Sequence, residues 1–518
     1  MSMAIAAVAT VIVALLIHSI CFSLFFSPLA RIPGPRSFAL TKWRLAYEDY
    51  KGSRTRKIHA LHEEYGPVVR VGPSEVSFNS LSALRAIYGA GSGFERTNFY
   101  HMFAAYGRLN MFSFNSTKQH SERKKLVAHT YAKSVMIKGE NARMIETNVR
   151  RFVELLEREG RRSNIFRTLH YFSLDNITEF VYGKFGKTSC LDGVEKDRDL
   201  LRDVMATGSR KLAWFTVHHP KFTAWLYSRA GILGYIARQF YPVQKPIPYT
   251  GIKLHAMKAC QKFSNASTEQ RVEHPSLIST LWKHHISQTG PDGLDDLDIA
   301  SECADHLDGG TDTTSDTLMF AIWSLSRPEH KAFQERLIHE VQSLPEALLN
   351  ADGIPRAEAA DKLDYVDAVI KETLRLYAPL PASEPRSSPK AMTIDGYLIP
   401  ARTTVSISPY TLHRNADVFK DPFSFNPDRW LDSSEEDLAE MKRLYWAFSS
   451  GGRMCIGMHL AMAEMSTLLA TIYRRYTTEP RGDFDAVSPG ITSRFEVFYD
   501  EGCSGVREHE CHVEFKPY

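Results

Sequence analysis

The first thirty residues of the chain contain no Asp, Glu, Lys or Arg, and this divides the sequence into two unequal parts. From Met3 to Phe26 nearly every residue is apolar. As a helix this run would extend about 36 Å, enough to cross a hydrocarbon layer of about 30 Å. A cleaved signal peptide would begin with basic residues and have a shorter apolar core. We therefore expect residues 1–30 to form a retained membrane anchor.

The residues after this run predict its orientation. Four basic residues follow it, namely Arg31, Arg36, Lys42 and Arg44. Because positive charge stays on the cytoplasmic side of a membrane, we expect a single-pass anchor with residues 31–518 in the cytosol. The sequence Ile32-Pro33-Gly34-Pro35 predicts a stiff, extended break that holds the body at a set distance from the bilayer.

Charge and cysteine content narrow the class of protein. The 518 residues include 63 Lys and Arg against 60 Asp and Glu, a net charge of +3, which argues against a dedicated nucleic-acid binder. Hydrophobic residues make up 43% and charged residues 24%, as in globular proteins. The seven cysteines are scattered and include no CxxC, so we expect neither a disulfide framework nor a structural zinc site.

Periodicity indicates one large, mostly helical body with a minor sheet. Amphipathic helices are predicted over Val149–Leu156, Asp298–Leu325, Glu329–Leu344 and Tyr365–Tyr377. Strands are predicted within Val68–Val76, Met392–Ile399 and Thr403–Ile407. Three prolines within residues 242–248 predict a loop, and no internal domain boundary is evident.

A single cysteine stands in an unusual setting, the segment Phe448-Ser-Ser-Gly-Gly-Arg453-Met-Cys455-Ile-Gly457. A helical pattern begins directly afterwards, at Met458. Unpaired N–H groups at a helix start favour an anion, so a thiolate is stabilised there and can ligate a metal. Arg453 could pair with an acidic group of a ligand. The ordinary alternative for a lone cysteine is a buried, inert side chain.

This FxxGxRxCxG segment resembles the haem-binding loop of the cytochromes P-450. The resemblance covers nearly the whole chain and implies their mainly α fold with a minor β-sheet region. It implies that Cys455 is the axial ligand of the iron of haem b and that Arg453 contacts a haem propionate. Phe448 and Gly457 would then belong to the loop that holds the cofactor.

A second unusual segment, Gly309-Gly310-Thr-Asp312-Thr313-Thr314, lies inside a predicted helix. Glycine and short polar residues are unfavourable in a helix interior. A segment that breaks local helix preferences in this way is typical of a functional site. The segment resembles the family's [AG]Gx[DE]T[TS] motif, where the helix opens over the haem. The resemblance implies that Asp312 and Thr313 relay protons. The alternative is a tight helix crossing at the glycines.

Two ExxR motifs occur, Glu159–Arg162 and Glu372–Arg375, and either could be a surface ion pair. Only the second precedes Pro427-Asp-Arg429-Trp430, which resembles the family's PERF/W box, and then Cys455. The resemblance implies that Glu372, Arg375 and Arg429 form a buried ion triad beneath the haem. Its role would be folding and haem retention.

Four further residues have weaker family counterparts. His120 and Lys124 occupy the register of the family's WxxxR helix, with His for Trp and Lys for Arg. Arg386 and, less clearly, His413 lie where the family places propionate partners. A solvated charge is the alternative for each.

The implied reaction is that of a haem-thiolate monooxygenase, R–H + O₂ + 2e⁻ + 2H⁺ → R–OH + H₂O. Electrons would come from NADPH through a membrane-bound reductase at the endoplasmic reticulum, docking on a basic face of Arg123, Lys124, Lys125, Lys442 and Arg443. The chain looks most like fungal microsomal members, many of which tailor secondary metabolites. The alternatives are a non-monooxygenase rearranging enzyme of the same fold, and a non-catalytic haem carrier or sensor.

Aromatic and sulfur-containing residues predict an apolar substrate pocket. They cluster in one stretch and comprise Phe99, Tyr100, Met102, Phe103, Tyr106, Met111, Phe112 and Phe114. Plain core packing is the alternative for about half of them.

Overall fold

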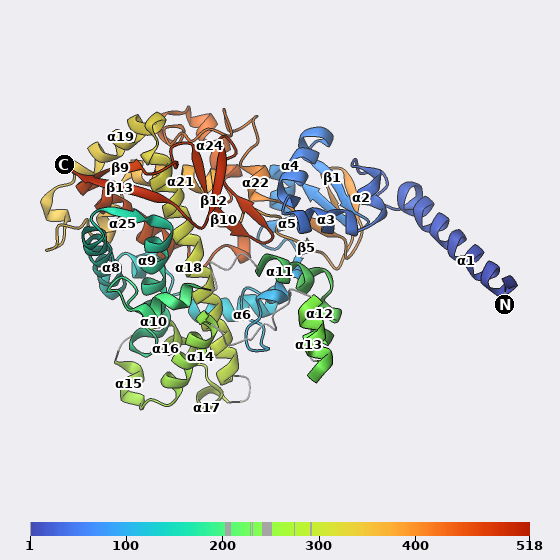
Figure 1. Ribbon diagram of the computed structural model, residues 1–518, viewed down its shortest axis with the longest axis horizontal. Coiled ribbons are helices and arrows are strands. Elements are labelled where there is room, and N and C mark those ends of the chain that lie inside the picture. The colour runs from blue at the N-terminus through green and yellow to red at the C-terminus, as the bar shows by residue number, and fades with distance from the viewer. Residues whose placement is uncertain are drawn as a thin grey trace.

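The computed structural model describes residues 2–202, 209–227, 229, 231–240, 251–273, 275–290 and 293–518. One long helix, α18 (Asp296–Ser326), runs through the centre of the body (Figure 1). The capping box of Asp295 and Asp298 starts it, and from Thr314 onward every residue of it is buried. It packs most extensively on α9 (Ile165–Tyr182). Around these two lie α8 (Gly139–Arg158), α14 (Gly251–Ser264), α19 (Lys331–Gln342), α21 (Asp364–Leu376) and α25 (Met458–Arg475).

A five-stranded sheet in the order β1-β2-β8-β5-β3 forms the other side of the body, nearer the N-terminus (Figure 1). Its strands are β1 (Val68–Gly72), β2 (Glu75–Phe78), β8 (Thr404–Ser406), β5 (Arg386–Ser387) and β3 (Glu95–Arg96). Helices α3 (Trp43–Lys51), α4 (Arg54–Tyr65) and α5 (Leu81–Tyr88) accompany it. The sheet therefore joins the first hundred residues to the segment around residue 400.

Three smaller sheets complete the described fold. They are β11-β10-β12 (Glu496–Phe498, Val487–Ser493, Gly505–Glu508), β4-β13-β9 (Arg162–Asn164, His512–Pro517, Tyr476–Pro480) and the hairpin β6-β7 (Met392–Ile394, Tyr397–Ile399). The four predicted helices and the predicted strands are confirmed. The pairing of β4 with the C-terminal strands was not predicted, because such short strands carry little alternation of their own. The loop predicted at residues 242–248 lies outside the described residues.

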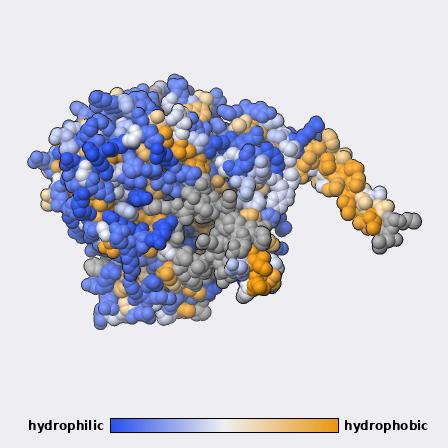
Figure 2. Space-filling model, viewed as in Figure 1, coloured by the Kyte–Doolittle hydropathy of each residue, from blue (hydrophilic) through white to orange (hydrophobic). Residues whose placement is uncertain are grey.

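The N-terminal helix α1 (Ser2–Cys21) and a π-helical turn (Phe22–Phe26) project from the body (Figures 1 and 2). The segment Ile5–Phe26 is long and apolar enough to cross a membrane. Figure 2 shows a second apolar surface on α13 (Gly231–Phe240), where Ile232 is 75% and Leu233 66% exposed.

The proline-rich break after the anchor, predicted to be stiff and extended, makes close contacts with the body. Ile32 is buried in the core beside the sheet, and the Arg70 N–H donates to the Pro33 carbonyl at 2.8 Å. At Gly34 a Cβ would lie 2.6 Å from the Arg70 carbonyl oxygen, so only glycine permits this approach. The Arg70 guanidinium also donates to the Ser23 carbonyl at 2.8 Å. The break is therefore docked on β1, because these contacts hold it in place.

Candidate active site

The loop that carries Cys455 is held in a single conformation by backbone contacts. It follows α24 (Glu435–Leu444), passes through a 3₁₀ turn (Gly451–Arg453) and leads into α25. The Cys455 N–H donates to the Phe448 carbonyl at 2.9 Å. Gly451 has φ +61°, and a Cβ there would lie 2.3 Å from the Tyr88 carbonyl oxygen. The glycine is therefore required by both its φ and its close contact with α5.

Cys455 is exposed, in contrast to the buried Cys190, Cys260, Cys303 and Cys511. Burial raises the pKa of the thiol, while the backbone N–H groups of Gly457 and Met458 and the charge of Lys124 act in the opposite direction. A Cβ at Gly457 would be only 3.9 Å from Sγ. The helix start thus offers the sulfur two N–H groups and an open side, as a metal-ligating thiolate needs.

Five basic side chains lie near one another above this loop, and we call them the cationic cluster: Arg96, His120, Lys124, Arg386 and Arg453. They come from β3, α6 (Thr117–Val127), β5 and the cysteine loop. Arg96 and Arg386 lie directly opposite each other across the antiparallel pair β3-β5. Like charges in such a pair are destabilising unless an anion lies between them.

The cluster has too few anions of its own. The carboxylate of Glu384 pairs with Arg386 at 3.1 Å, and Arg453 donates one bond to the Asn115 carbonyl. The second Arg453 terminal nitrogen is buried and has no partner in the described structure. Burial, then Arg96 and Arg386, lower the pKa of Arg453 to about 9.

The same imbalance acts on the histidine of the cluster. Burial, followed by Arg453, Arg96, Lys124 and Arg386, lowers the pKa of His120 to about 3. Buried cations without enough partners need an anionic ligand. The two carboxylates of a haem fit that need, and the accessible thiol of Cys455 fits the iron.

The two glycines of the distal helix have different surroundings. A Cβ at Gly310 would lie 2.6 Å from Ile177 on α9, so this glycine permits the tight crossing of α18 and α9. A Cβ at Gly309 would meet no atom within 4 Å. Gly309 therefore borders open space, and the helix crossing accounts for only one of the pair.

The predicted opening of the distal helix is not present, since α18 continues through residues 309–314. The Thr313 hydroxyl donates to the Gly309 carbonyl, one helical turn earlier, at 2.7 Å. This hydrogen bond satisfies the hydroxyl without interrupting the helix. The Asp312 side chain is 49% exposed, yet burial of its surroundings, and then Asp308, raise its pKa to about 7. An acid with such a pKa holds a proton near neutral pH.

The ion triad forms as the resemblance implied. Arg375 donates to both carboxylate oxygens of Glu372, at 2.8 and 2.9 Å, and Arg429 donates to one of them at 3.1 Å. The Trp430 indole and the Asn426 N–H complete the shell of Glu372, at 3.0 and 2.9 Å. The Glu372 and Arg375 side chains are both 0% exposed. Although burial opposes it, Arg375 holds the pKa of Glu372 below its usual value.

His413 is not a propionate partner, because both of its ring nitrogens are occupied. It is fully buried, and Nδ1 donates to the Arg375 carbonyl at 3.1 Å. Nε2 accepts from the Trp446 N–H at 2.8 Å. His413 therefore links the ion triad to the segment that leads into the cysteine loop.

Comparison with known proteins agrees with this geometry. The sequence model described as Cytochrome P450 matches residues 33–490. The chain belongs to the cytochrome P450 family. It is 28% identical to the cytochrome P450 monooxygenase orf2 of Aspergillus niger over 480 residues, 90% of this chain and 89% of the relative. It is 29% identical to the monooxygenases aflV of Aspergillus parasiticus (87% and 85% covered) and hepC of Aspergillus oryzae (90% and 91% covered).

Membership of the family defines the chemistry in outline. This P450 is a monooxygenase, an oxidoreductase with a haem cofactor, electrons supplied by a reductase and a small-molecule substrate. The roles of individual residues toward the haem remain predictions. Lys124, for example, donates to the Gly452 and Met454 carbonyls, so its described contacts are with the cysteine loop.

The aromatic stretch of this P450 lies against the cationic cluster. The Arg96 guanidinium lies over the rings of Tyr100 and Phe112, 4.4 and 4.3 Å from their centroids. Tyr100 is 4% and Phe103 40% exposed, so the stretch combines core packing with open surface.

Arg123 does not belong to the predicted basic face for a reductase. Its side chain is only 12% exposed and is bound to the buried carboxylate of Glu302.

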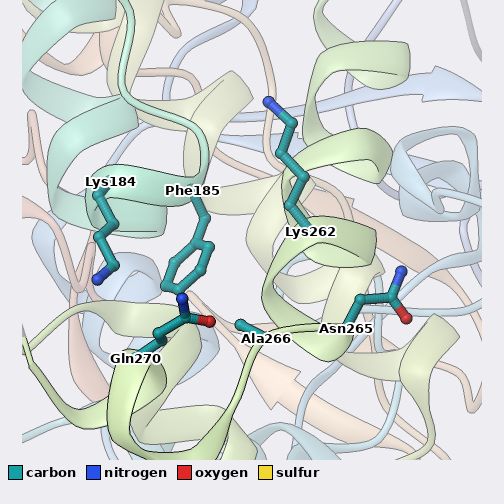
Figure 3. A pocket seen from close by; sticks show the side chains of 6 residues that line it. All are labelled: Lys184, Phe185, Lys262, Asn265, Ala266 and Gln270. Carbon is teal, nitrogen blue, oxygen red and sulfur yellow. The ribbon is translucent and has the colours of Figure 1, made fainter.

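A separate, open pocket of about 520 Å³ lies between the turn Gly183–Phe185, α14 and α15 (Thr268–Val272) (Figure 3). It is lined by Lys184, Phe185, Lys262, Asn265, Ala266 and Gln270. None of the residues assigned to the haem lines it, and Lys184 is already paired with Glu273.

Sequence reasoning missed Arg96, Glu384 and two residues behind Asp312, His170 and Asp316. Arg96 joins the site only through the pairing of β3 with β5, which has no local signal. Asp316 follows Asp312 at helical spacing, so it could have been found as a second acid on the same helix face.

Proposed function

We propose that this P450 uses haem b to insert one atom of O₂ into an apolar small molecule, as a tailoring step in fungal secondary metabolism. Electrons come from NADPH through a membrane-bound reductase. Residues 1–30 anchor the protein in the endoplasmic reticulum membrane, and residues 31–518 form the catalytic unit in the cytosol. The observation that carries the proposal is an exposed Cys455 beside a cationic cluster that has fewer counter-ions than charges.

In this proposal each part of the site has one task. When bound, haem supplies the activation of O₂, with a thiolate pushing electron density toward O–O cleavage. Cys455 provides the sulfur donor, aided by the N–H groups of Gly457 and Met458. The cationic cluster binds the propionate carboxylates. Asp312 holds a proton at its carboxyl group and precedes Thr313, whose hydroxyl donates to the Gly309 carbonyl.

The first experiment is a carbon-monoxide difference spectrum of the reduced, full-length protein and of Cys455→His. The wild-type protein should give the red-shifted Soret band of a thiolate-ligated haem, and Cys455→His should bind haem without that shift. A wild-type protein that is folded and contains haem but lacks the shift would show that Cys455 is not the ligand. A carrier or sensor would give the same band but no substrate-dependent NADPH oxidation.

A second test addresses the acid–alcohol pair once a substrate has been found by spin-state titration. Thr313→Ala should keep NADPH consumption but divert most of it to hydrogen peroxide, because the proton-holding hydroxyl is lost. The ratio of product to NADPH measures this effect. Unchanged coupling would refute the proton-relay role, whereas a rearranging enzyme would form product without NADPH.

A further inference from the structure

A buried histidine lies directly behind Asp312. His170, on α9, is 1% exposed, and its Nε2 lies 3.7 Å from Asp312 Oδ1 and 3.8 Å from Asp316 Oδ1. Its Nδ1 lies 2.6 Å from the Phe166 carbonyl oxygen, which can only accept a hydrogen bond. Nδ1 therefore carries a proton, and a neutral His170 presents a bare nitrogen to the two carboxyl groups.

The three facing atoms need a proton between them. His170 Nε2, Asp312 Oδ1 and Asp316 Oδ1 are all buried, and none has a hydrogen-bond partner in the described part of the chain. If both carboxyl groups were ionised and His170 neutral, three acceptors would face one another without a donor. At least one proton shared among the three groups removes this conflict.

The surroundings of the three groups favour their uncharged forms. Burial, and then the nearby His509, keep the pKa of His170 at about 4, and burial and Asp308 raise that of Asp312 to about 7. Burial and then Asp312 raise the pKa of Asp316 well above its usual value. The Phe166 ring stacks on His509 and packs at a tilt against His170, so it contacts both histidines.

Asp312 differs from the other two because it has an open side. Its side chain is 49% exposed, whereas those of Asp316 and His170 are 10% and 1% exposed. One carboxylate oxygen of Asp312 thus faces the trio, and the remainder of the side chain faces accessible space next to Thr313.

We propose that His170 and Asp316 form a proton store that positions Asp312 and returns a proton to it after each delivery. Asp312 gives up one proton on its open side. His170 Nε2 takes a proton from Asp316 and passes it to Asp312, and solvent returns one proton to Asp316 between turnovers. No electrons move in these steps. His170 and Asp316 are positioning residues, and the proposal rests on the proton-delivery role proposed for Asp312.

The test is an infrared pH titration of the full-length, haem-containing ferric protein in detergent, without substrate. The signal is the C=O stretch of protonated carboxyl groups, which reports the trio whether or not the enzyme turns over. The variants are His170→Gln and Asp316→Asn. The matched control is His62→Gln, because His62 is another buried histidine, on α4, whose ring bonds Ser77 and Gly66 rather than any residue of α18.

We expect a carboxylic-acid band that titrates near neutral pH in the wild-type protein and in His62→Gln. Asp316→Asn should remove one component of the band, which the difference from the wild-type spectrum isolates from the other acids whose pKa is raised by burial, Glu302, Asp305, Asp308 and Glu464. His170→Gln should raise the acid dissociation constant at least tenfold, because an amide N–H in place of Nε2 favours the ionised carboxylate. The proposal is overturned if His170→Gln titrates like His62→Gln, or if Asp316→Asn keeps the full band. Failure of the proton-delivery role alone would instead leave the band changes intact and the coupling of Thr313→Ala normal.

Discussion

Two groups of buried arginines adjoin the cysteine loop, the ion triad and the cationic cluster, and they differ in how their charge is balanced. In the ion triad, Glu372 accepts bonds from two arginines, and Arg375 also donates to the carbonyls of His413, Pro422 and Ser424. In the cationic cluster, Arg96 faces Arg386 and one Arg453 nitrogen has no partner. In a fully paired buried group, removing one partner leaves an uncompensated charge, whereas a buried charge that is already unpaired indicates a place for a ligand.

The largest effect is expected from removing the negative charge of the ion triad. Glu372→Gln should abolish haem retention and destabilise the protein by about 3–5 kcal/mol, because two buried guanidinium groups lose their counter-ion. Thermal unfolding and haem content measure the effect. The matched control is Glu159→Gln in the second ExxR, where Arg162 is 62% exposed and pairs with Glu514 instead. That variant should change stability by less than about 0.5 kcal/mol, and equal losses would mean that burial does not distinguish the motifs.

An intermediate effect is expected from removing one positive charge of the cationic cluster. Arg453→Leu should lower haem affinity by about thirtyfold, equivalent to about 2 kcal/mol, because a buried partner of a carboxylate is lost. The same change should leave the haem-free protein at least as stable as wild type, since it removes repulsion from Arg96 and Arg386. Haem transfer to apomyoglobin and unfolding of the haem-free protein measure the two effects. Equal destabilisation with and without haem would show that Arg453 is structural.

The smallest effect is a pH dependence. The folded pKa of His120 is about 3, below the 6.5 of an unfolded histidine, so unfolding takes up a proton as the pH falls below 6.5. Stability of the haem-free protein should therefore be complete above pH 6.5 and decline toward pH 3, by up to about 2 kcal/mol at pH 5. His120→Gln should flatten this decline. If propionates balance the cluster, the haem-containing protein should also show a flatter profile.

The parts of the molecule that sequence predicted are those with local signals. Helical periodicity predicted α18 and α21. The prediction that Cys455 lies in a glycine-rich loop directly before a helix is confirmed. The triad was inferred from motif order, and the structure brings its three residues together. The cluster was only half predicted, because Arg96 reaches it through strand pairing that no local pattern reveals.

Errors arose where one residue had two plausible surroundings. The sequence around His413 does not distinguish a histidine that binds a propionate from one that, as here, bonds two backbone groups. Arg123 was placed on the surface because its buried partner, Glu302, lies on a helix far along the chain. His170 carries no motif at all, and only the crossing of α9 and α18 places it behind Asp312.

The docking of the proline-rich break on β1 has a mechanical consequence. A flexible linker would let the body rotate relative to the anchor. Here Arg70 on β1 donates hydrogen bonds to the carbonyls of both Pro33 and Ser23, so the N-terminal helix and the five-stranded sheet move as one rigid unit. If α1 crosses a bilayer, its tilt therefore sets the orientation of the whole body relative to that bilayer. Replacing Arg70 should then loosen the orientation of the body relative to the bilayer without altering the site itself.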